Sequence, residues 1–250
     1  TLFPYTTLFR SISPTAMHGF DNVQPLSPAE SCWSPLDDDT RDQSFRRHVR
    51  PYNENQRLLM ESIDSHPITF ALGPAGTGKT YLAIAAACEA FEDGRVARIL
   101  LSRPAVEAGE NLGYLPGGME DKLLPYLRPL YDALNDRLGA RKLKALLADG
   151  SIEIAPVAFM RGRTLNNAFI IVDEAQNCTY GQIKMLLTRL GWHSTMVITG
   201  DLDQSDLLPG LSGLTDISRR LEPLDGIAQV HLTEADVVRH PLVASMIPYL

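Results

Sequence analysis

Short apolar runs alternate along this chain with stretches whose apolar positions recur every three or four residues. The runs are rich in Ile, Val and Leu, and we interpret them as buried strands. They are Ile68–Leu72, Ile99–Ser102, Ser151–Val157, Ala168–Val172, Thr195–Thr199 and Ile227–Leu232. Because such strands alternate with helical stretches, the pattern predicts an α/β fold in which helices cover both faces of a mostly parallel sheet.

Helices are predicted between these strands. Asn53–Ile63 is a short amphipathic stretch, with its apolar side chains on one side. Lys79–Phe91 is apolar and rich in Ala, and Gly94 just after it is typical of a helix end. Both stretches are therefore interpreted as helices.

Two later stretches carry breaks or caps. Asp121–Leu147 has helical spacing with interruptions that predict two or three short helices. The interruptions are Pro125, Pro129 and Gly139. After the strand at Ala168–Val172, Thr179 is placed to cap a helix, Gln182 completes a capping box, and Gly191 follows the expected final turn.

The segment Thr1–Arg50 has a different character. It is rich in Pro and Ser, contains three consecutive aspartates at Asp37–Asp39, and has no sustained period. We interpret residues 1–50 as a mostly disordered leader and residues 51–250 as one domain. The opening Thr-Leu-Phe recurs at residues 7–9. The recurrence suggests that these first residues are a non-native part of the leader, and we leave them out of the fold prediction. A short apolar tail that docks on the core is the alternative.

Composition narrows the class of protein only slightly. Of the 250 residues, 44% are hydrophobic, which is ordinary for a globular protein. The net charge of -7 does not suggest nucleic-acid binding through bulk charge, although a local basic patch remains compatible with it. The three cysteines are widely spaced and suggest neither a metal site nor a disulfide framework. No apolar run approaches the length of a membrane span, so a cytoplasmic location is expected.

The strongest chemical motif follows the first predicted strand. It fits G-x-x-x-x-G-K-[ST] at every fixed position. Its residues are Gly73, Pro74, Ala75, Gly76, Thr77, Gly78, Lys79 and Thr80. Glycines let backbone N–H groups surround a phosphate, and the following helix points its positive end at it. Lys79 would reach the β- and γ-phosphates and Thr80 would ligate Mg²⁺, so the loop predicts a nucleotide site.

A second motif places two acids at the end of a strand. Asp173 and Glu174 directly follow the apolar run Ala168–Val172. Ligands gather at the carboxyl ends of parallel strands, so the pair is expected beside the phosphate loop. Asp173 would hold Mg²⁺, and Glu174 would act as the general base on an attacking water. Taken alone, such a pair is equally typical of a solvated strand end.

A third polar motif follows the strand Thr195–Thr199. Gln204, in Gly-Asp-Leu-Asp-Gln, is a candidate to orient the attacking water or to sense the γ-phosphate. Alone, the motif is more typical of a surface turn. Together with the two earlier motifs it favours a functional role.

With these motifs in order, the chain resembles the PhoH family of P-loop ATPases and, less closely, the superfamily 1 helicases. The resemblance runs from about Arg50 to the end of the chain. The matching stretches are GPAGTGKTYLA at Gly73–Ala83, SRPAVEAGENLGYLPG at Ser102–Gly117, PVAFMRGRTLNNAFIIVDEAQN at Pro156–Asn177, TGDLDQSDL at Thr199–Leu207 and DVVRHPLV at Asp236–Val243.

The resemblance implies a RecA-like ATPase core that uses ATP and Mg²⁺. It implies that Gln56 recognises adenine, that Gln204 couples the γ-phosphate to a nucleic-acid site, and that Arg239 is an arginine finger. For Gln56 and Arg239, an exposed helix-start residue and a helix-end residue remain the alternatives. Because the chain has room for only one RecA-like lobe, we expect a homo-oligomeric ring, possibly hexameric in form, in which Arg239 would act on a neighbouring subunit.

The expected partners are ATP and single-stranded RNA, with no membrane. Candidate phosphate contacts are Arg103, Arg161 and Arg163, and Tyr114, in the glycine-rich segment Gly109–Gly118, is a candidate to stack on a base. Solvated arginines and a core tyrosine are the alternatives. The first functional hypothesis is therefore an RNA-linked ATPase. A small-molecule kinase and a nucleotide-dependent switch or scaffold are the others, although Glu174 disfavours a kinase and no N-K-x-D guanine motif is present.

Overall fold

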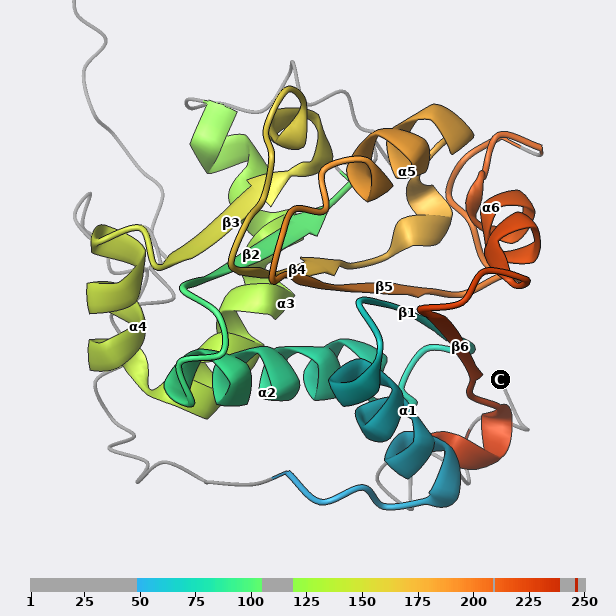
Figure 1. Cartoon of the computed structure of the whole chain (residues 1–250), viewed down its shortest axis with the longest axis horizontal. Helices are drawn as coiled ribbons and strands as arrows, with labels where there is room; N and C mark the ends of the chain where they lie inside the picture. Colours follow the sequence, from blue (N-terminus) through green and yellow to red (C-terminus); the bar gives the residue numbers. More distant parts are fainter. Residues whose placement is uncertain (1–48, 105–118, 209, 239–245, 247–250) are drawn as a thin grey trace, which may run out of the picture. The chain divides into compact units, whose positions relative to one another are not determined.

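A parallel sheet forms the centre of the molecule. The computed structural model describes residues 49–104, 119–208, 210–238 and 246. Within them, six strands form one sheet in the order β3-β2-β4-β5-β1-β6, and every neighbouring pair is parallel (Figure 1). The strands are β1 (Ile68–Leu72), β2 (Arg98–Arg103), β3 (Ile152–Pro156), β4 (Ala168–Val172), β5 (Thr195–Gly200) and β6 (Ile227–His231). All the predicted strands are confirmed, with ends that differ by one residue at most.

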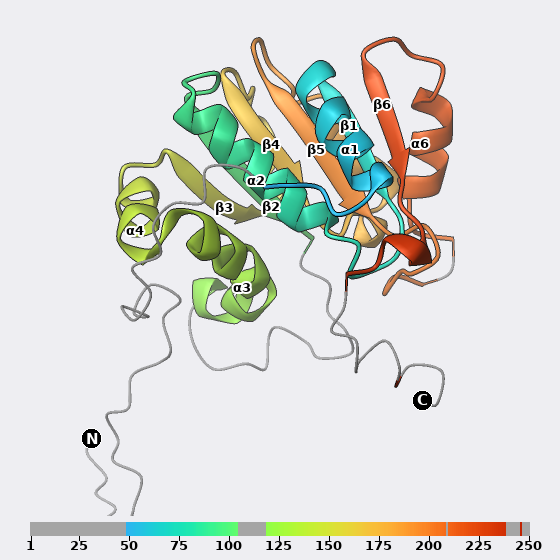
Figure 2. The same ribbon diagram turned by 90° about the horizontal axis from the view of Figure 1, so that it is seen from below.

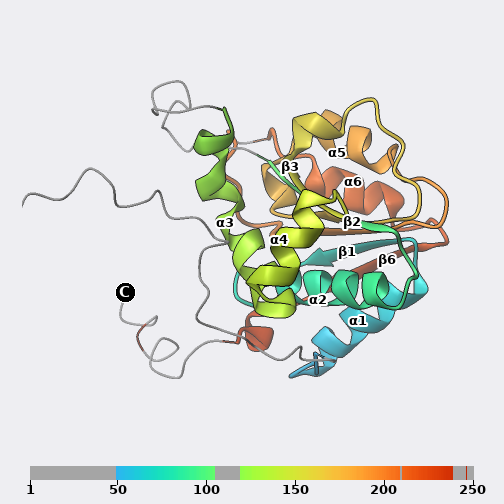
Figure 3. The same ribbon diagram turned by 90° about the vertical axis from the view of Figure 1, so that its left-hand side faces the viewer.

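Helices cover both faces of this sheet. They are α1 (Glu54–Ser65), α2 (Lys79–Glu92), α3 (Met119–Leu138), α4 (Ala140–Ala148), α5 (Tyr180–Leu187) and α6 (Leu214–Leu221). Helices α1 and α2 lie on one face, and α5 and α6 lie on the other (Figures 1 and 3). The α/β architecture predicted from the sequence is therefore confirmed.

The alternation of side chains along β4 shows how the sheet separates two cores. Phe169 and Ile171 pack in the cluster that includes α1, α2, α3 and α4. Ile170 and Val172 pack in the cluster that includes α5 and α6. All four side chains are buried, which explains why the strand is continuously apolar rather than alternating. Figure 2 shows α1 and α2 lying across their face of the strands.

The prediction for Asp121–Leu147 was wrong about the prolines. Helix α3 continues through Pro125 and Pro129, and the chain breaks only at Gly139, before α4. Each interior proline costs about 3 kcal/mol of helix stability. Burial opposes this cost, because side chains at helical spacing along α3 pack into the core. They are Leu127, Leu130, Leu134 and Leu138.

The capping box predicted for α5 is confirmed. The Thr179 hydroxyl accepts from the Gln182 N–H, and the Gln182 side chain accepts from the Thr179 N–H. The helix ends at Leu187, before Gly191. Gly191 instead permits a close approach, since a Cβ there would lie 2.1 Å from Oδ1 of Asn166. Its place as the helix stop was therefore a wrong prediction.

Several sequence predictions lie outside the described residues. They are the leader as far as residue 48, the Gly109–Gly118 segment with Tyr114, and the candidate finger Arg239. Among the described residues, no helix is both long enough and apolar enough to cross a membrane.

Candidate nucleotide site

The glycine-rich loop connects β1 to α2 at the carboxyl edge of the sheet. Gly78 precedes the first residue of α2 and has a φ of 87°, which is the left-handed region that favours glycine. Gly73 has a φ of 141°, and a Cβ on it would lie 2.2 Å from the carbonyl oxygen of Leu232. The loop therefore has a glycine where a side chain would strain the turn and another where it would collide with the chain after β6.

Lys79 is held over this loop. Its ammonium donates to the carbonyl oxygens of Gly73 at 2.6 Å and Pro74 at 2.7 Å. Burial lowers the pKa of Lys79, and the nearby carboxylates oppose that shift. These carboxylates belong to Asp201, Glu174 and Asp173. The lysine is thus a partly buried cation whose charged form is favoured by three nearby carboxylates.

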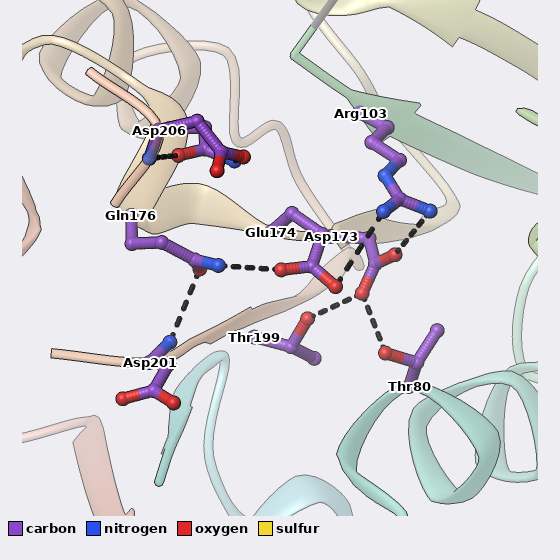
Figure 4. Close-up of polar contacts among 9 residues, drawn as sticks. Thr80, Arg103, Asp173, Glu174, Gln176, Thr199, Asp201 and Asp206 are labelled. Atoms are coloured by element: carbon purple, nitrogen blue, oxygen red, sulfur yellow. Dashed lines mark hydrogen bonds and ion pairs between the residues drawn. The ribbon is translucent and has the colours of Figure 1, made fainter. Parts of the chain in front are cut away.

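Asp173 is the point at which the loop and the sheet meet. Its Oδ1 accepts the hydroxyl of Thr80 at 2.5 Å and the hydroxyl of Thr199 at 2.7 Å (Figure 4). Thr80 comes from the start of α2 and Thr199 from β5, which lies between β1 and β4 in the sheet. Sequence reasoning did not single out Thr199, because its contact depends on the strand order.

The donor set around Asp173 fits Mg²⁺. A hydroxyl and a carboxylate meet here, and both are the hard oxygen ligands that this ion uses together with nucleotide phosphates. In the part of the chain that the structure describes, no group of three or more His, Cys, Asp and Glu side chains is arranged to hold a metal ion. Thr80 and Asp173 would therefore hold the ion jointly with a bound nucleotide.

Glu174 has an unusual backbone and two side-chain neighbours. Its φ of 53° and ψ of 43° lie in the left-handed region, which is uncommon for a residue other than glycine. Gln176 donates to its Oε2. The Arg103 guanidinium lies 3.6 Å from its Oε1 and 3.7 Å from Oδ2 of Asp173 (Figure 4). The acidic pair is thus positioned from β2 and from the turn after β4.

Gln176 connects the second motif to the third. While its Nε2 donates to Glu174, its Oε1 accepts the backbone N–H of Asp201 at 3.1 Å (Figure 4). The next residue extends the connection, because the Asn177 amide exchanges two hydrogen bonds of 2.8 Å with Asp206. The short 3-10 helix η3 (Ala175–Asn177) therefore fixes the loop after β5. Sequence reasoning missed Gln176, although its place two residues after Glu174 was a usable signal.

The three motifs line one cleft of about 260 Å³. Its walls are Ala75, Gly76, Gly78, Lys79, Thr80, Tyr81, Asp173, Glu174, Gln176, Thr199, Gly200, Asp201 and Gln204. Gln204 is exposed, and its side chain makes no hydrogen bond within the described residues. Its place on the wall brings it together with the predicted loop and acids, while its catalytic role stays a prediction.

Gln56 lies beside the phosphate loop, with its side-chain amide bonded to backbone groups. Its side chain is buried, its Nε2 donates to the carbonyl of Thr77 at 2.9 Å, and its Oε1 accepts the N–H of Tyr52 at 2.8 Å. Both ends of the amide are therefore paired with backbone groups, and the residue braces the loop. Adenine recognition by Gln56 stays a prediction that would require these bonds to be exchanged.

The arginines after β3 have separate environments. Arg163 forms a fork with Glu153, with N–O distances of 2.6 and 2.7 Å. Arg161 is exposed and has no partner among the residues that the structure describes. Next to them, on the 3-10 helix η2 (Val157–Met160), Phe159 is 61% exposed. Arg161 and Phe159 are thus available to a ligand, whereas Arg163 holds its loop against β3.

We expect Arg163→Gln to lower the free energy of unfolding by about 0.5–1 kcal/mol at pH 7, because the pair is only partly buried. The hydrogen bond from Arg163 lowers the pKa of Glu153, against an opposing effect of burial. A lowered folded pKa gives stability that is present above the unfolded pKa of about 4.3 and is lost as pH falls through the folded value. Urea denaturation should therefore show a difference between wild type and variant that shrinks below about pH 4.

Arg161→Gln is the matched control for this measurement, since it removes a nearby exposed arginine without a partner in the described residues. An equal loss of stability in both variants, or a loss that does not change with pH, would contradict the assignment of Arg163.

The fold and the cleft together define the class of protein to which this chain belongs. A parallel α/β sheet with a phosphate loop after β1, and with acids from β4 opposite it, makes this chain a nucleotide-binding P-loop protein. A sequence profile described as PhoH-like protein matches residues 48–250. The chain belongs to the PhoH-like protein family.

Known relatives agree with this membership. The chain is 52% identical over 202 residues to a PhoH-like protein of Bacillus subtilis (strain 168), covering 80% of this chain and 63% of that protein. It is 44% identical over 207 residues to Protein PhoH of Escherichia coli (strain K12), covering 82% and 58%. This chain thus spans about three fifths of the length of these relatives.

Two solved structures show a distant likeness to this chain. The SWI2/SNF2 ATPase core of Sulfolobus solfataricus in complex with dsDNA has a TM-score of 0.41 and 18% identity, covering 73% of this chain and 46% of that one. The Pif1 helicase of Candida albicans has a TM-score of 0.38 and 12% identity, covering 74% and 41%. Likeness at this level carries no argument about function.

Proposed function

We propose that this protein hydrolyses ATP with the help of Mg²⁺. The observation that carries the proposal is the single cleft in which Lys79 of the loop faces Asp173 and Glu174. Asp173 accepts the hydroxyl of Thr80, and Glu174 projects beside it from a strained backbone. The proposal assigns binding of the phosphates to the loop and acceptance of a proton from water to Glu174.

The proposed chemistry divides among the residues of the cleft. Lys79 and the N–H groups of the loop neutralise the phosphates and hold them in line for attack. Glu174 accepts the proton of the attacking water, and Gln176 keeps the carboxylate oriented through its amide. When bound, Mg²⁺ supplies further charge neutralisation at the phosphate oxygens.

Release of inorganic phosphate from ATP tests this proposal. Purified protein with Mg²⁺ should release phosphate, and the Discussion gives the variants that assign that release to this site. A small-molecule kinase is the alternative for which the product would instead be a phosphorylated acceptor. A nucleotide-dependent switch or scaffold would bind ATP without measurable turnover.

We further propose that the ATPase is coupled to single-stranded RNA at the carboxyl edge of β3. Phe159 is an exposed aromatic side chain on which a base can stack, and Arg161 is an exposed cation two residues away. Both follow β3, whose last residue Pro156 lies opposite Arg103 in the sheet. The RNA would thus lie at the same edge of the sheet as the nucleotide cleft.

Binding of a fluorescein-labelled oligouridylate, followed by fluorescence anisotropy, tests the RNA proposal. Loss of stacking in Phe159→Ala should weaken binding by roughly 5- to 100-fold. Loss of a phosphate contact in Arg161→Gln should also reduce the slope of binding against salt by about one.

Trp192→Ala is the matched control, because Trp192 is 81% exposed but precedes β5, at the opposite edge of the sheet. If Phe159→Ala binds the oligonucleotide as wild type does, or if both aromatic variants lose affinity equally, the assignment of this surface is wrong. Membership of a ring and a cytoplasmic location stay predictions, to be checked by sedimentation with ATP and by cell fractionation.

A further inference from the structure

Arg103 lies between the carboxylates of Asp173 and Glu174 without a hydrogen bond to either. Its guanidinium nitrogens are 3.7 Å from Oδ2 of Asp173 and 3.6 Å from Oε1 of Glu174 (Figure 4). A guanidinium that hydrogen-bonds a carboxylate usually does so at about 2.7–2.9 Å. No hydrogen bond from the Arg103 side chain is found among the described residues. Its N–H donors therefore face both carboxylates at ion-pair distance without a hydrogen bond to either.

The Arg103 guanidinium is largely buried and lacks a close hydrogen-bond acceptor among the described residues, which is an unfavourable state for its N–H donors. The Arg103 side chain is 22% exposed, so it has lost most of its contact with water. A guanidinium has five N–H donors in a planar fork that suits carboxylate or phosphate oxygens. In the same protein, Glu153 accepts two hydrogen bonds from the guanidinium fork of Arg163, at 2.6 and 2.7 Å. These distances are about 1 Å shorter than those from Arg103 to its two carboxylates.

The two acids that face Arg103 also have other partners. Oδ1 of Asp173 accepts two hydroxyl groups, and Oε2 of Glu174 accepts the Gln176 amide. These contacts fix the acids from the side away from Arg103. The arginine can therefore move toward a new anion while both carboxylates keep their remaining hydrogen bonds.

The phosphate loop determines where a new anion would lie. Lys79 and Thr80 bind the β- and γ-phosphates in the proposed function, and Thr80 is bonded to the same Asp173 that faces Arg103. In the proposed function, the γ-phosphate would be the part of a nucleoside triphosphate nearest the acids. A diphosphate ends one phosphate earlier and lacks the group that would meet the guanidinium.

We propose that Arg103 recognises the γ-phosphate and so distinguishes a nucleoside triphosphate from a diphosphate. In the nucleotide-free protein the guanidinium stays beside Asp173 and Glu174, and with a triphosphate it donates to the terminal phosphate instead. This inference rests on the proposed function, because it assumes that the cleft binds ATP.

Titration calorimetry of ATP and ADP in the presence of Mg²⁺ tests the inference. The titrations use the full chain carrying Glu174→Gln, so that ATP is not consumed and the result does not depend on turnover. Adding Arg103→Gln should weaken ATP binding by roughly 10- to 100-fold, which corresponds to the loss of a hydrogen bond between charged groups. The affinity for ADP should stay within about twofold of that of the parent. Arg103→Lys should have an ATP affinity between those of the parent and Arg103→Gln, because an ammonium keeps the charge but lacks the planar fork of donors.

Arg98→Gln is the matched control, because Arg98 lies at the opposite end of the same strand β2. It should bind both nucleotides as the parent does. Circular dichroism melting curves establish that each variant is folded, and Arg103→Lys provides a second reading if Arg103→Gln is unstable.

A parallel loss of ATP and ADP affinity in the Arg103 variants would show a structural role and overturn the inference, as would no change in either. Failure of the proposed function looks different. It would appear as absence of phosphate release by the wild-type protein, whatever the ratio of ATP to ADP affinity.

Discussion

Lys79→Ala should lower the rate of phosphate release from ATP by about 100-fold or more, which is the usual cost of removing one preorganised group that stabilises the transferring phosphoryl charge. The physical reason lies in the position of the ammonium, which is anchored by the carbonyls of Gly73 and Pro74 and faces the cleft. The alanine variant keeps the loop backbone but removes its only side-chain cation. ATP affinity should fall as well, because the ground-state phosphates also lose this charge.

Lys184→Ala is the control for this measurement, since Lys184 is an exposed lysine on α5, on the other face of the sheet (Figure 1). It should release phosphate at the wild-type rate. Hydrolysis by Lys79→Ala at the same rate as wild type would refute the assignment of the cleft, and would indicate a contaminating ATPase or another site.

Glu174→Gln should separate binding from chemistry. The amide has nearly the shape of the carboxylate but cannot accept a proton from water, so kcat should fall by about 10²- to 10⁴-fold. ATP affinity should stay near that of wild type, because the phosphate loop, Thr80 and Asp173 are unchanged. Single-turnover phosphate release and equilibrium binding of ATP measure the two effects separately.

Glu222→Gln provides the comparison, because Glu222 is an exposed acid at the end of α6 and contributes nothing to the cleft. If Glu174→Gln lost ATP binding and turnover together, Glu174 would hold the nucleotide rather than act as the base. If turnover were unchanged, another group would have to accept the proton.

The sequence predicted an element correctly where the residues of that element alone determine its structure. The buried strand Ala168–Val172 and the capped start of α5 at Thr179 were predicted correctly, because apolar runs and capping boxes are local signals. Helix α3 was predicted wrongly, because its continuation through Pro125 depends on leucines that pack against other elements. Helix α6 was not predicted at all, although Leu214 and Ile217 are spaced for one buried face.

The sequence was sufficient to identify the motifs of the site, but not to predict the hydrogen bonds that connect them. Lys79, Asp173 and Glu174 were predicted to lie together, and the cleft confirms that they do. The bonds through Thr199 and Gln176 depend on which strands are neighbours, and no local pattern contains that information. A spacing also cannot show that the Gln56 amide is hydrogen-bonded to the backbone groups of Thr77 and Tyr52.

The phosphate loop is joined to the far end of the described chain. Leu232 donates its N–H to the carbonyl of Leu72 at 2.7 Å, and Val238 donates to the carbonyl of Gly76 at 3.0 Å. These hydrogen bonds link the two regions thermodynamically. A nucleotide that favours one arrangement of the loop therefore also changes the affinity of any molecule that binds and displaces the segment after β6. Linkage is reciprocal, and that molecule would change nucleotide affinity by the same factor. The segment from Leu232 to Val238 is thus thermodynamically coupled to the nucleotide site.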